Sequence, residues 1–206
     1  LSDFVVMTEA ASMFSAGPPI VKGAIGEVVT KEQLGGPAVH VALSGVAHNL
    51  AADDGAAIAL ARRYLSYFPQ NAWAHPPLAE SGDVGPRSLD GILALIDPDP
   101  RIPFDAHALL DMLVDAGTLL EIQPRYGASL VTVLARLGGR AVAILANNPS
   151  VGAAAIDAAA AMKAAHFLDV AGAFHLPVVF LTDNPGVMAG TAAERSGVLR
   201  HAARMG

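Results

Sequence analysis

The segment from Ser129 to Thr182 limits the possible folds more than any other part of the chain. Two strongly apolar runs in it are joined by Gly138 and Gly139, a pair typical of a tight β-hairpin turn. An alanine-rich stretch over residues 153–173 follows and predicts a long helix. The run Pro177–Thr182 is almost wholly apolar, as in a strand from the middle of a covered parallel sheet. This order predicts an α/β layer architecture whose ligand-facing loops follow its strands.

Shorter helices are expected elsewhere. Asp105 has the side chain of an N-cap and precedes apolar residues at helical spacing, so a helix is expected as far as Ala116. The same spacing predicts a helix between Asn49 and Tyr67. Pro18 is expected to begin a short helix, because its fixed φ suits the first helical position.

A proline- and glycine-rich stretch over residues 69–103 is typical of a connection between two parts of a chain. We expect an N-terminal domain with its connector over 1–84 and a C-terminal domain over 85–206. Both ends of the sequence lie within patterned stretches rather than in tails. We therefore expect a piece of a longer chain, in which each of the two domains is partial.

The composition excludes several classes of protein. Of the 206 residues 53% are hydrophobic and 16% charged, which is apolar enough to form a real core and excludes disorder. The absence of cysteine excludes a disulfide scaffold, a thiolate-ligated metal and a cysteine nucleophile. With 13 basic against 19 acidic residues, no nucleic-acid partner is expected. Charged residues interrupt every long apolar run, so no membrane partner is expected either.

Short motifs rich in glycine, proline and asparagine occur along the whole chain. Each is weak by itself, whereas the complete set in this order is specific. The set includes Gly17-Pro18-Pro19 with Val21-Lys22, Gly26–Thr30, Gln33–Gly36, His40, Ser44–His48, Tyr67–Pro69, Pro76-Pro77, Pro103–Asp105, Glu121–Pro124, Gly139-Arg140, Asn147–Pro149, Asp183–Gly186, Gly190-Thr191, Glu194, Gly197 and Arg200. With it the sequence resembles the carboxyltransferase (β) subunits of biotin-dependent acyl-CoA carboxylases, a group that includes propionyl-CoA carboxylase and related decarboxylases.

The resemblance implies a fold, a reaction and partners. The expected fold is a pair of crotonase-like domains, each a ββα spiral, in a homo-oligomer from dimer to hexamer. The expected reaction moves a carboxyl group from carboxybiotin to the α-carbon of an acyl-CoA substrate. Biotin would be carried on a partner subunit or domain, together with a biotin carboxylase. The expected location is cytoplasmic, or the mitochondrial matrix in a eukaryote.

The resemblance also implies which residues face each ligand. Backbone N–H groups in oxyanion holes would stabilise the negative charge that develops on both reactants. The glycine pairs that supply these donors are expected outside this chain, so no catalytic residue is assigned within it. No histidine pair has the spacing of a helical metal site, and no metal is expected. The acyl-CoA side is expected at Gly35, Gly36, His40, Ser44, Gly45 and His48, and the biotin side at Asn147, Asn148, Pro149, Gly186, Gly190 and Thr191.

Alternatives to a carboxylase component remain open. The loop over residues 185–190 contains Val187, Met188 and Ala189, where the family usually has a phenylalanine after the Pro-Gly pair, and Leu120 also stands where phenylalanine is usual. The altered loop motivates a non-catalytic paralogue kept for assembly. A biotin-dependent acyl-CoA decarboxylase, which runs similar chemistry in reverse, is the other alternative. The glycines and asparagines also suit ordinary turns, and a lone histidine is more often a hydrogen-bonded structural residue.

Overall fold

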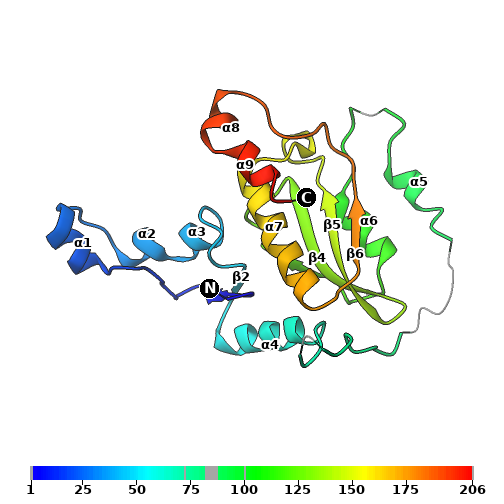
Figure 1. Ribbon diagram of the computed structural model, residues 1–206, viewed down its shortest axis with the longest axis horizontal. Coiled ribbons are helices and arrows are strands. Elements are labelled where there is room, and N and C mark those ends of the chain that lie inside the picture. The colour runs from blue at the N-terminus through cyan, green and yellow to red at the C-terminus, as the bar shows by residue number, and fades with distance from the viewer. Residues whose placement is uncertain (1, 72, 82–87, 100, 206) are drawn as a thin grey trace. The chain divides into compact units, whose positions relative to one another are not determined.

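The structure is a computed structural model that describes residues 2–71, 73–81, 88–99 and 101–205 (Figure 1). The chain divides into two compact units, Leu1–Arg63 and Tyr64–Gly206, which are described separately. The domain boundary predicted between residues 84 and 85 lies outside the described residues and stays a prediction.

The first unit contains a two-stranded parallel sheet, β1 paired with β2, and a series of short helices. Its small core consists of Met7, Val41 and Ala47. Helix α1 begins at Pro18 as predicted, and a capping box formed by Thr30 and Gln33 begins α2. The elements are β1 (Val6–Thr8), α1 (Pro18–Ile25), α2 (Lys31–Gly35), α3 (Pro37–His40), β2 (Asn49–Ala51) and α4 (Asp54–Leu65), which ends just past the boundary.

The helix predicted between Asn49 and Tyr67 is only partly correct. Asn49–Ala51 forms strand β2, and the helix begins at Asp54. The strand forms because β1, far away in the sequence, supplies backbone partners, with Val6 opposite Asn49. Local apolar spacing carries no information about such a pairing.

The second unit is built on a four-stranded sheet of order β3-β4-β5-β6, in which β3, β4 and β5 are antiparallel neighbours and β6 runs parallel to β5. The predicted hairpin is confirmed: Gly138 and Gly139 form its turn with φ of +56° and +78°. The elements are α5 (Ile92–Leu95), α6 (Ala106–Leu113), β3 (Leu120–Ile122), β4 (Leu130–Leu137), β5 (Arg140–Asn147), the 3₁₀ helix η1 (Gly152–Ala154), α7 (Ala158–Ala173), β6 (Val178–Leu181), α8 (Thr191–Arg195) and α9 (Val198–Ala202).

The main core lies between the sheet and α6. Leu110 of α6 packs with alternate residues of β4 and β5, such as Val133 and Ile144. The intervening residues, such as Leu134 and Leu145, are equally buried and belong to the face that α7 covers. Asp105 caps α6 as predicted, because its carboxylate accepts the N–H groups of His107 and Ala108. The two faces explain why β4 and β5 are apolar along their whole length.

Two expectations for this unit are wrong. Helix α7 begins at Ala158 rather than at residue 153, because Ala153 and Ala154 have φ of +52° and +60°, which a right-handed helix does not allow. Strand β6 lies at an edge of the described sheet rather than in its middle. Its Phe180 side chain is 56% exposed, while Val179 packs against the core.

Polar groups attach the segment after α4 to the hairpin. The Arg136 guanidinium donates to the carbonyl oxygens of Ser66 and Pro77 at 2.7 and 2.8 Å. The Asp115 carboxylate accepts the N–H groups of the two turn glycines, Gly138 and Gly139, at 2.8 and 2.7 Å. Part of the stretch predicted to connect two domains, at Pro77, therefore belongs to the second unit and is hydrogen-bonded to its hairpin.

Candidate functional site

The residues expected on the acyl-CoA side all lie in the first unit. Gly35 and Gly36 end α2, and both are in places where a side chain does not fit. A Cβ on Gly35 would lie 1.9 Å from the Met13 carbonyl oxygen, and one on Gly36 would lie 2.7 Å from that of Glu32. These glycines are therefore required by close backbone packing, whatever else they do.

His40 lies beside these glycines and is held at both ring nitrogens. Its Nε2 donates to the Met13 carbonyl oxygen, and its Nδ1 lies 2.9 Å from the Ser44 hydroxyl. Since a carbonyl only accepts, the neutral ring carries its proton on Nε2 and its Nδ1 accepts from Ser44. Gly45 follows with a φ of +66°. The structure thus brings Gly35 and His40 together at the Met13 carbonyl, with Ser44 on the other side of the His40 ring.

His48 is apart from that cluster and is buried next to the two-stranded sheet. Its Nδ1 accepts the Val5 N–H at 2.9 Å, and its ring lies 5.7 Å from that of Phe4. This environment is that of a structural histidine that orders the start of β1.

The residues expected on the biotin side lie in the second unit, at the carboxyl ends of β5 and β6. Asn147 ends β5 and is 5% exposed. Its Oδ1 accepts the Asp183 N–H at 3.1 Å and the Asn184 Nδ2 at 2.9 Å, and Asn184 in turn accepts the Gly186 N–H. One side chain therefore ties the end of β5 to the loop after β6. Carboxyl ends of parallel strands are the usual place for a ligand in α/β sheets.

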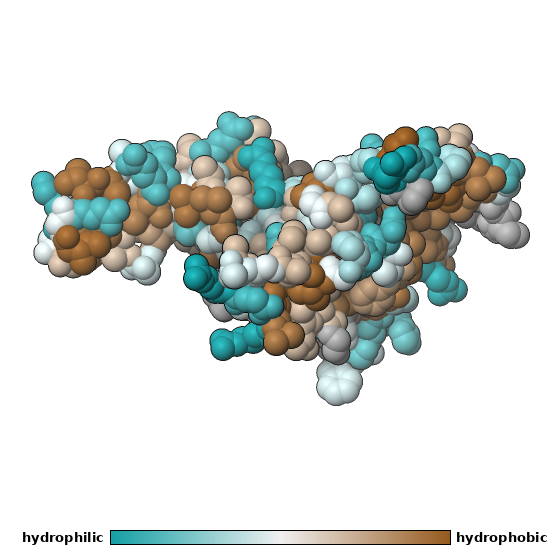
Figure 2. Space-filling model, turned by 90° about the horizontal axis from the view of Figure 1, so that it is seen from above, coloured by the Kyte–Doolittle hydropathy of each residue, from teal (hydrophilic) through white to brown (hydrophobic). Residues whose placement is uncertain are grey.

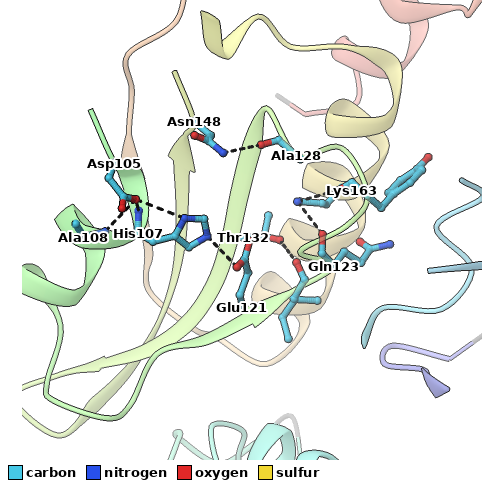
Figure 3. Close-up of polar contacts among 11 residues, drawn as sticks. Asp105, His107, Ala108, Glu121, Gln123, Ala128, Thr132, Asn148 and Lys163 are labelled. Atoms are coloured by element: carbon cyan, nitrogen blue, oxygen red, sulfur yellow. Dashed lines mark hydrogen bonds and ion pairs between the residues drawn. The ribbon is translucent and has the colours of Figure 1, made fainter. Parts of the chain in front are cut away.

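Asn148 holds the other side of the same turn. Its backbone N–H donates to the Ser129 carbonyl oxygen at 2.9 Å, and its Nδ2 donates to that of Ala128 at 3.1 Å (Figure 3). Its Oδ1 accepts the Ser150 N–H just beyond Pro149. The turn Asn147–Pro149 is thus fixed to the end of β5, which Asn147 forms, and to the residues just before β4.

The loop after β6 is joined to the start of α7 by backbone pairing. Ile156 donates to the Gly186 carbonyl oxygen at 3.0 Å and accepts the Met188 N–H at 2.9 Å. Gly186 and Gly190 have φ of +109° and +118°, and no described atom lies within 4 Å of a Cβ built on either. Thr191 follows Gly190 as the first residue of α8. Both glycines leave open space beside the backbone, which a flat ligand ring can approach.

Lys163 is a residue that the sequence analysis did not assign to the site. It is 1% exposed on α7, and its Nζ donates to the carbonyl oxygens of Gln123 and Tyr126 at 3.0 and 2.9 Å (Figure 3). Burial lowers the pKa of Lys163 to about 8, against the opposing effect of the Glu121 and Asp157 carboxylates. The signal that indicates it is a single lysine within an alanine-rich stretch, with apolar residues on every side.

A half-exposed contact between a histidine and two carboxylates lies on the face of the sheet that α6 covers. His107 Nε2 lies 2.9 Å from Glu121 Oε2, and its Nδ1 lies 3.8 Å from Asp105 (Figure 3). The contact between His107 and Glu121 connects α6 to β3.

A cavity of about 280 Å³ opens between α7 and α9. Its lining residues are Met162, Ala165, His166, Asp169, His201 and Arg204, so the residues expected on the biotin side are not part of it.

Two other kinds of site are absent from the residues that the structure describes. These residues contain no group of three or more histidine, aspartate or glutamate side chains placed to hold a metal ion. Within the same ranges, no helix has the length and apolar character needed to cross a membrane.

A mixed sheet with a helix on each face, and tied loops at the ends of its parallel strands, defines an α/β protein. The family model for the carboxyl transferase domain matches residues 1–205, and the chain belongs to this family. The predicted family and fold class are thus confirmed.

Named relatives agree with this assignment. The chain is 38% identical over 206 residues to the methylmalonyl-CoA carboxyltransferase 12S subunit of Propionibacterium freudenreichii subsp. shermanii, covering 100% of this chain and 39% of that subunit. It is 37% identical to the methylmalonyl-CoA decarboxylase subunit alpha of Veillonella parvula, covering 100% of this chain and 40% of that one. A crystal structure of transcarboxylase 12S, described as a hexamer with methylmalonyl-CoA bound, matches with a TM-score of 0.93 at 38% identity, over 99% of this chain and 40% of that one. The chain spans about 40% of the length of these relatives.

Proposed function

We propose that this chain is part of a carboxyltransferase that moves a carboxyl group from carboxybiotin to the α-carbon of an acyl-CoA. The observation that carries the proposal is the pair of loops at the carboxyl ends of β5 and β6, tied together by Asn147, in a chain of the carboxyl transferase family. The relative from Propionibacterium is named for activity on methylmalonyl-CoA.

The second unit supplies the biotin side in this proposal. Gly186 and Gly190 leave open space beside the backbone, which would let the planar ureido ring of biotin approach it. Biotin supplies the carboxyl group and, once that group has left, a basic ring nitrogen. The turn Asn147–Pro149 and the residues Gly190-Thr191 would orient that ring and exclude water from it. The oxyanion donors that complete the site are assigned to parts of the protein outside this chain.

The first unit supplies the acyl-CoA side. Backbone turns at Gly35, Gly36 and Gly45 and the hydrogen-bonded pair His40–Ser44 would line the wall along which the CoA moiety lies. The buried His48 would act through the fold by ordering β1 rather than by touching the substrate.

The proposed partners are a biotin carrier with its biotin carboxylase and further copies of the same chain. A homo-oligomer is supported by the hexamer described for transcarboxylase 12S. It is also supported by exposed apolar residues on α1, where Ile20 and Ile25 are 64% and 72% exposed (Figure 2, left end). A cytoplasmic location, or the mitochondrial matrix in a eukaryote, stays a prediction.

The test is an assay of the full-length protein with malonyl-CoA or methylmalonyl-CoA and free biotin. We expect biotin-dependent loss or transfer of the carboxyl group from either CoA thioester. No turnover above a biotin-free control, from a protein that is folded and assembled, would refute the proposal and favour the non-catalytic paralogue.

A decarboxylase is the second candidate, because the relative from Veillonella parvula is named as one. Both enzymes exchange a carboxyl group between an acyl-CoA and biotin. Co-purification from the native host distinguishes them: a decarboxylase is expected to bring a membrane sodium-pump subunit with it, and a carboxylase component is expected to bring a biotin carboxylase.

A further inference from the structure

Lys163 is a charged group placed where the fold would otherwise be apolar. It lies on α7, is 1% exposed, and is surrounded on its own helix by buried alanines such as Ala160 and Ala164. Its Nζ reaches two backbone carbonyls, those of Gln123 and Tyr126. A buried amine is retained only where it is hydrogen-bonded, and here both acceptors belong to one turn.

That turn has a conformation that its own residues do not favour. Gln123 has a φ of +56°, in the left-handed region that is unfavourable for a residue with a side chain. Gly127, with a φ of +54°, lies against α7 so closely that a Cβ would be 2.6 Å from the Ala160 Cα. The turn is therefore held in place by contacts with α7, and the Lys163 side chain of that helix donates two hydrogen bonds to it.

The turn leads directly into the residues that hold Asn148. Ala128 and Ser129 follow Gly127, and their carbonyl oxygens accept the Nδ2 and backbone N–H of Asn148. A continuous path of hydrogen bonds and covalent bonds thus runs from the Lys163 ammonium to the turn Asn147–Pro149 (Figure 3).

We propose that Lys163 is a positioning residue for the biotin side of the site: it fixes the turn 123–127 so that Ala128 and Ser129 hold Asn148 in place. This inference rests on the proposed function, because it assigns Asn148 to the side that receives biotin. Lys163 is too deeply buried to touch a ligand itself.

The surroundings of Lys163 suit this role in either protonation state. Glu121 on β3 and the helix-capping Asp157 favour the charged ammonium, while burial opposes it. A neutral amine still carries two N–H donors, one for each carbonyl. The two contacts therefore persist when the side chain loses its proton.

The test substitutes Lys163→Met in the full-length protein, which keeps most of the side-chain volume and removes both donors. We expect the KM for free biotin to rise by about tenfold, since small displacements of a positioning group have large effects. The KM for the acyl-CoA is expected to stay within about twofold, because its side of the site is untouched. Equal changes in both constants, or no change in either, would overturn the inference.

A second variant guards against a Lys163→Met protein that does not fold. Pro124→Gly loosens the same turn from its exposed side without removing a contact of Lys163, and should raise the KM for biotin in the same direction by a smaller factor. Pro98→Gly makes the matched change in an exposed loop elsewhere and should leave both constants unchanged.

Amide hydrogen exchange separates failure of this inference from failure of the proposed function. If the wild-type protein shows no biotin-dependent turnover, the proposed function fails, but Lys163→Met or Pro124→Gly should still speed exchange at the Asn148 amide relative to that of Val133 in the sheet. Unchanged exchange at Asn148 in the folded variants would overturn the positioning role.

Discussion

At the scale of single residues, the second unit depends on polar side chains that act over long distances in sequence. Lys163 holds backbone carbonyls 37 and 40 residues away, and Asn147 holds groups 36 and 37 residues away. Each of these side chains is almost fully buried, so each hydrogen bond is made in a medium where an unpaired partner is costly. The position of the candidate biotin-side loops therefore depends on these side chains as well as on the backbone pairing at Ile156.

The buried lysine predicts a specific pH dependence of stability. Burial lowers the pKa of Lys163 to about 8 from an ordinary 10.5, so between these values the unfolded chain binds more protons than the folded one. The free energy of unfolding should therefore rise with pH across this window. Relative to Lys163→Met, which lacks the titration, the wild type should gain roughly 2 kcal/mol between pH 7 and 9.5.

Urea unfolding of both proteins at several pH values measures this gain. The range ends at 9.5 because burial also raises the pKa of Tyr126, whose ionisation in the unfolded chain begins to lower stability near pH 10. Parallel stability curves for the two proteins would contradict the prediction.

At the scale of elements, the turn of the β4–β5 hairpin needs glycine at two positions, one for its backbone conformation alone and the other also for lack of space. Gly138 and Gly139 both have positive φ, as its turn requires. No described atom lies within 4 Å of a Cβ on Gly138, whereas a Cβ on Gly139 would lie 2.1 Å from the Ala79 carbonyl oxygen. Two adjacent glycines are thus needed for different reasons.

The two glycines predict different costs of substitution. Gly138→Ala should lower the free energy of unfolding by about 1 kcal/mol, because it adds only the strain of a left-handed alanine. Gly139→Ala adds the same strain and also forces the segment at Ala79 away from the hairpin, so a loss at least twice as large, about 2–4 kcal/mol, is expected. Equilibrium urea unfolding of the two variants measures both losses. Equal losses of unfolding free energy would show that the segment at Ala79 moves away at no cost.

At the scale of the whole molecule, the low share of charged residues goes with large apolar side chains exposed on the surface. Residues such as Ile25, Val28 and Phe180 are more than half exposed. None of the residues of α1, all of which the structure describes, is buried. Apolar surface of this kind is typical of faces that pack against other protein chains. This agrees with the proposed homo-oligomer.

A charge on α1 should therefore affect assembly more than folding. Ile25→Asp in the full-length protein is expected to shift the oligomer toward smaller species while changing the free energy of unfolding by less than about 0.5 kcal/mol, because the side chain is exposed within its own unit. Light scattering after gel filtration measures the mass, and Lys22→Gln on the same helix is the control. An unchanged mass distribution would show that α1 makes no contact between copies.

Local patterns in the sequence predicted those parts of the fold that depend on local interactions. The Gly138-Gly139 turn, the start of α1 at Pro18 and the Asp105 cap of α6 involve residues within a few positions of one another. The family motifs were also visible, because they are short and lie in a fixed order. These features follow from backbone preferences that the residues carry with them.

Only the tertiary structure decided the rest. Residues Asn49–Ala51 became a strand because β1 supplied a partner, and α7 began at Ala158 because the preceding alanines were held at positive φ. The sequence placed Asn147 on the biotin side but could not show that its side chain binds Asp183 and Asn184, and it assigned no role to Lys163 at all. Asparagine suits any turn, and lysine is usually on the surface. A buried hydrogen bond between distant residues forms only when the elements that carry its two groups pack together. The physical reason is that its contribution to stability depends on the exclusion of water by that packing, which residues nearby in the sequence do not determine.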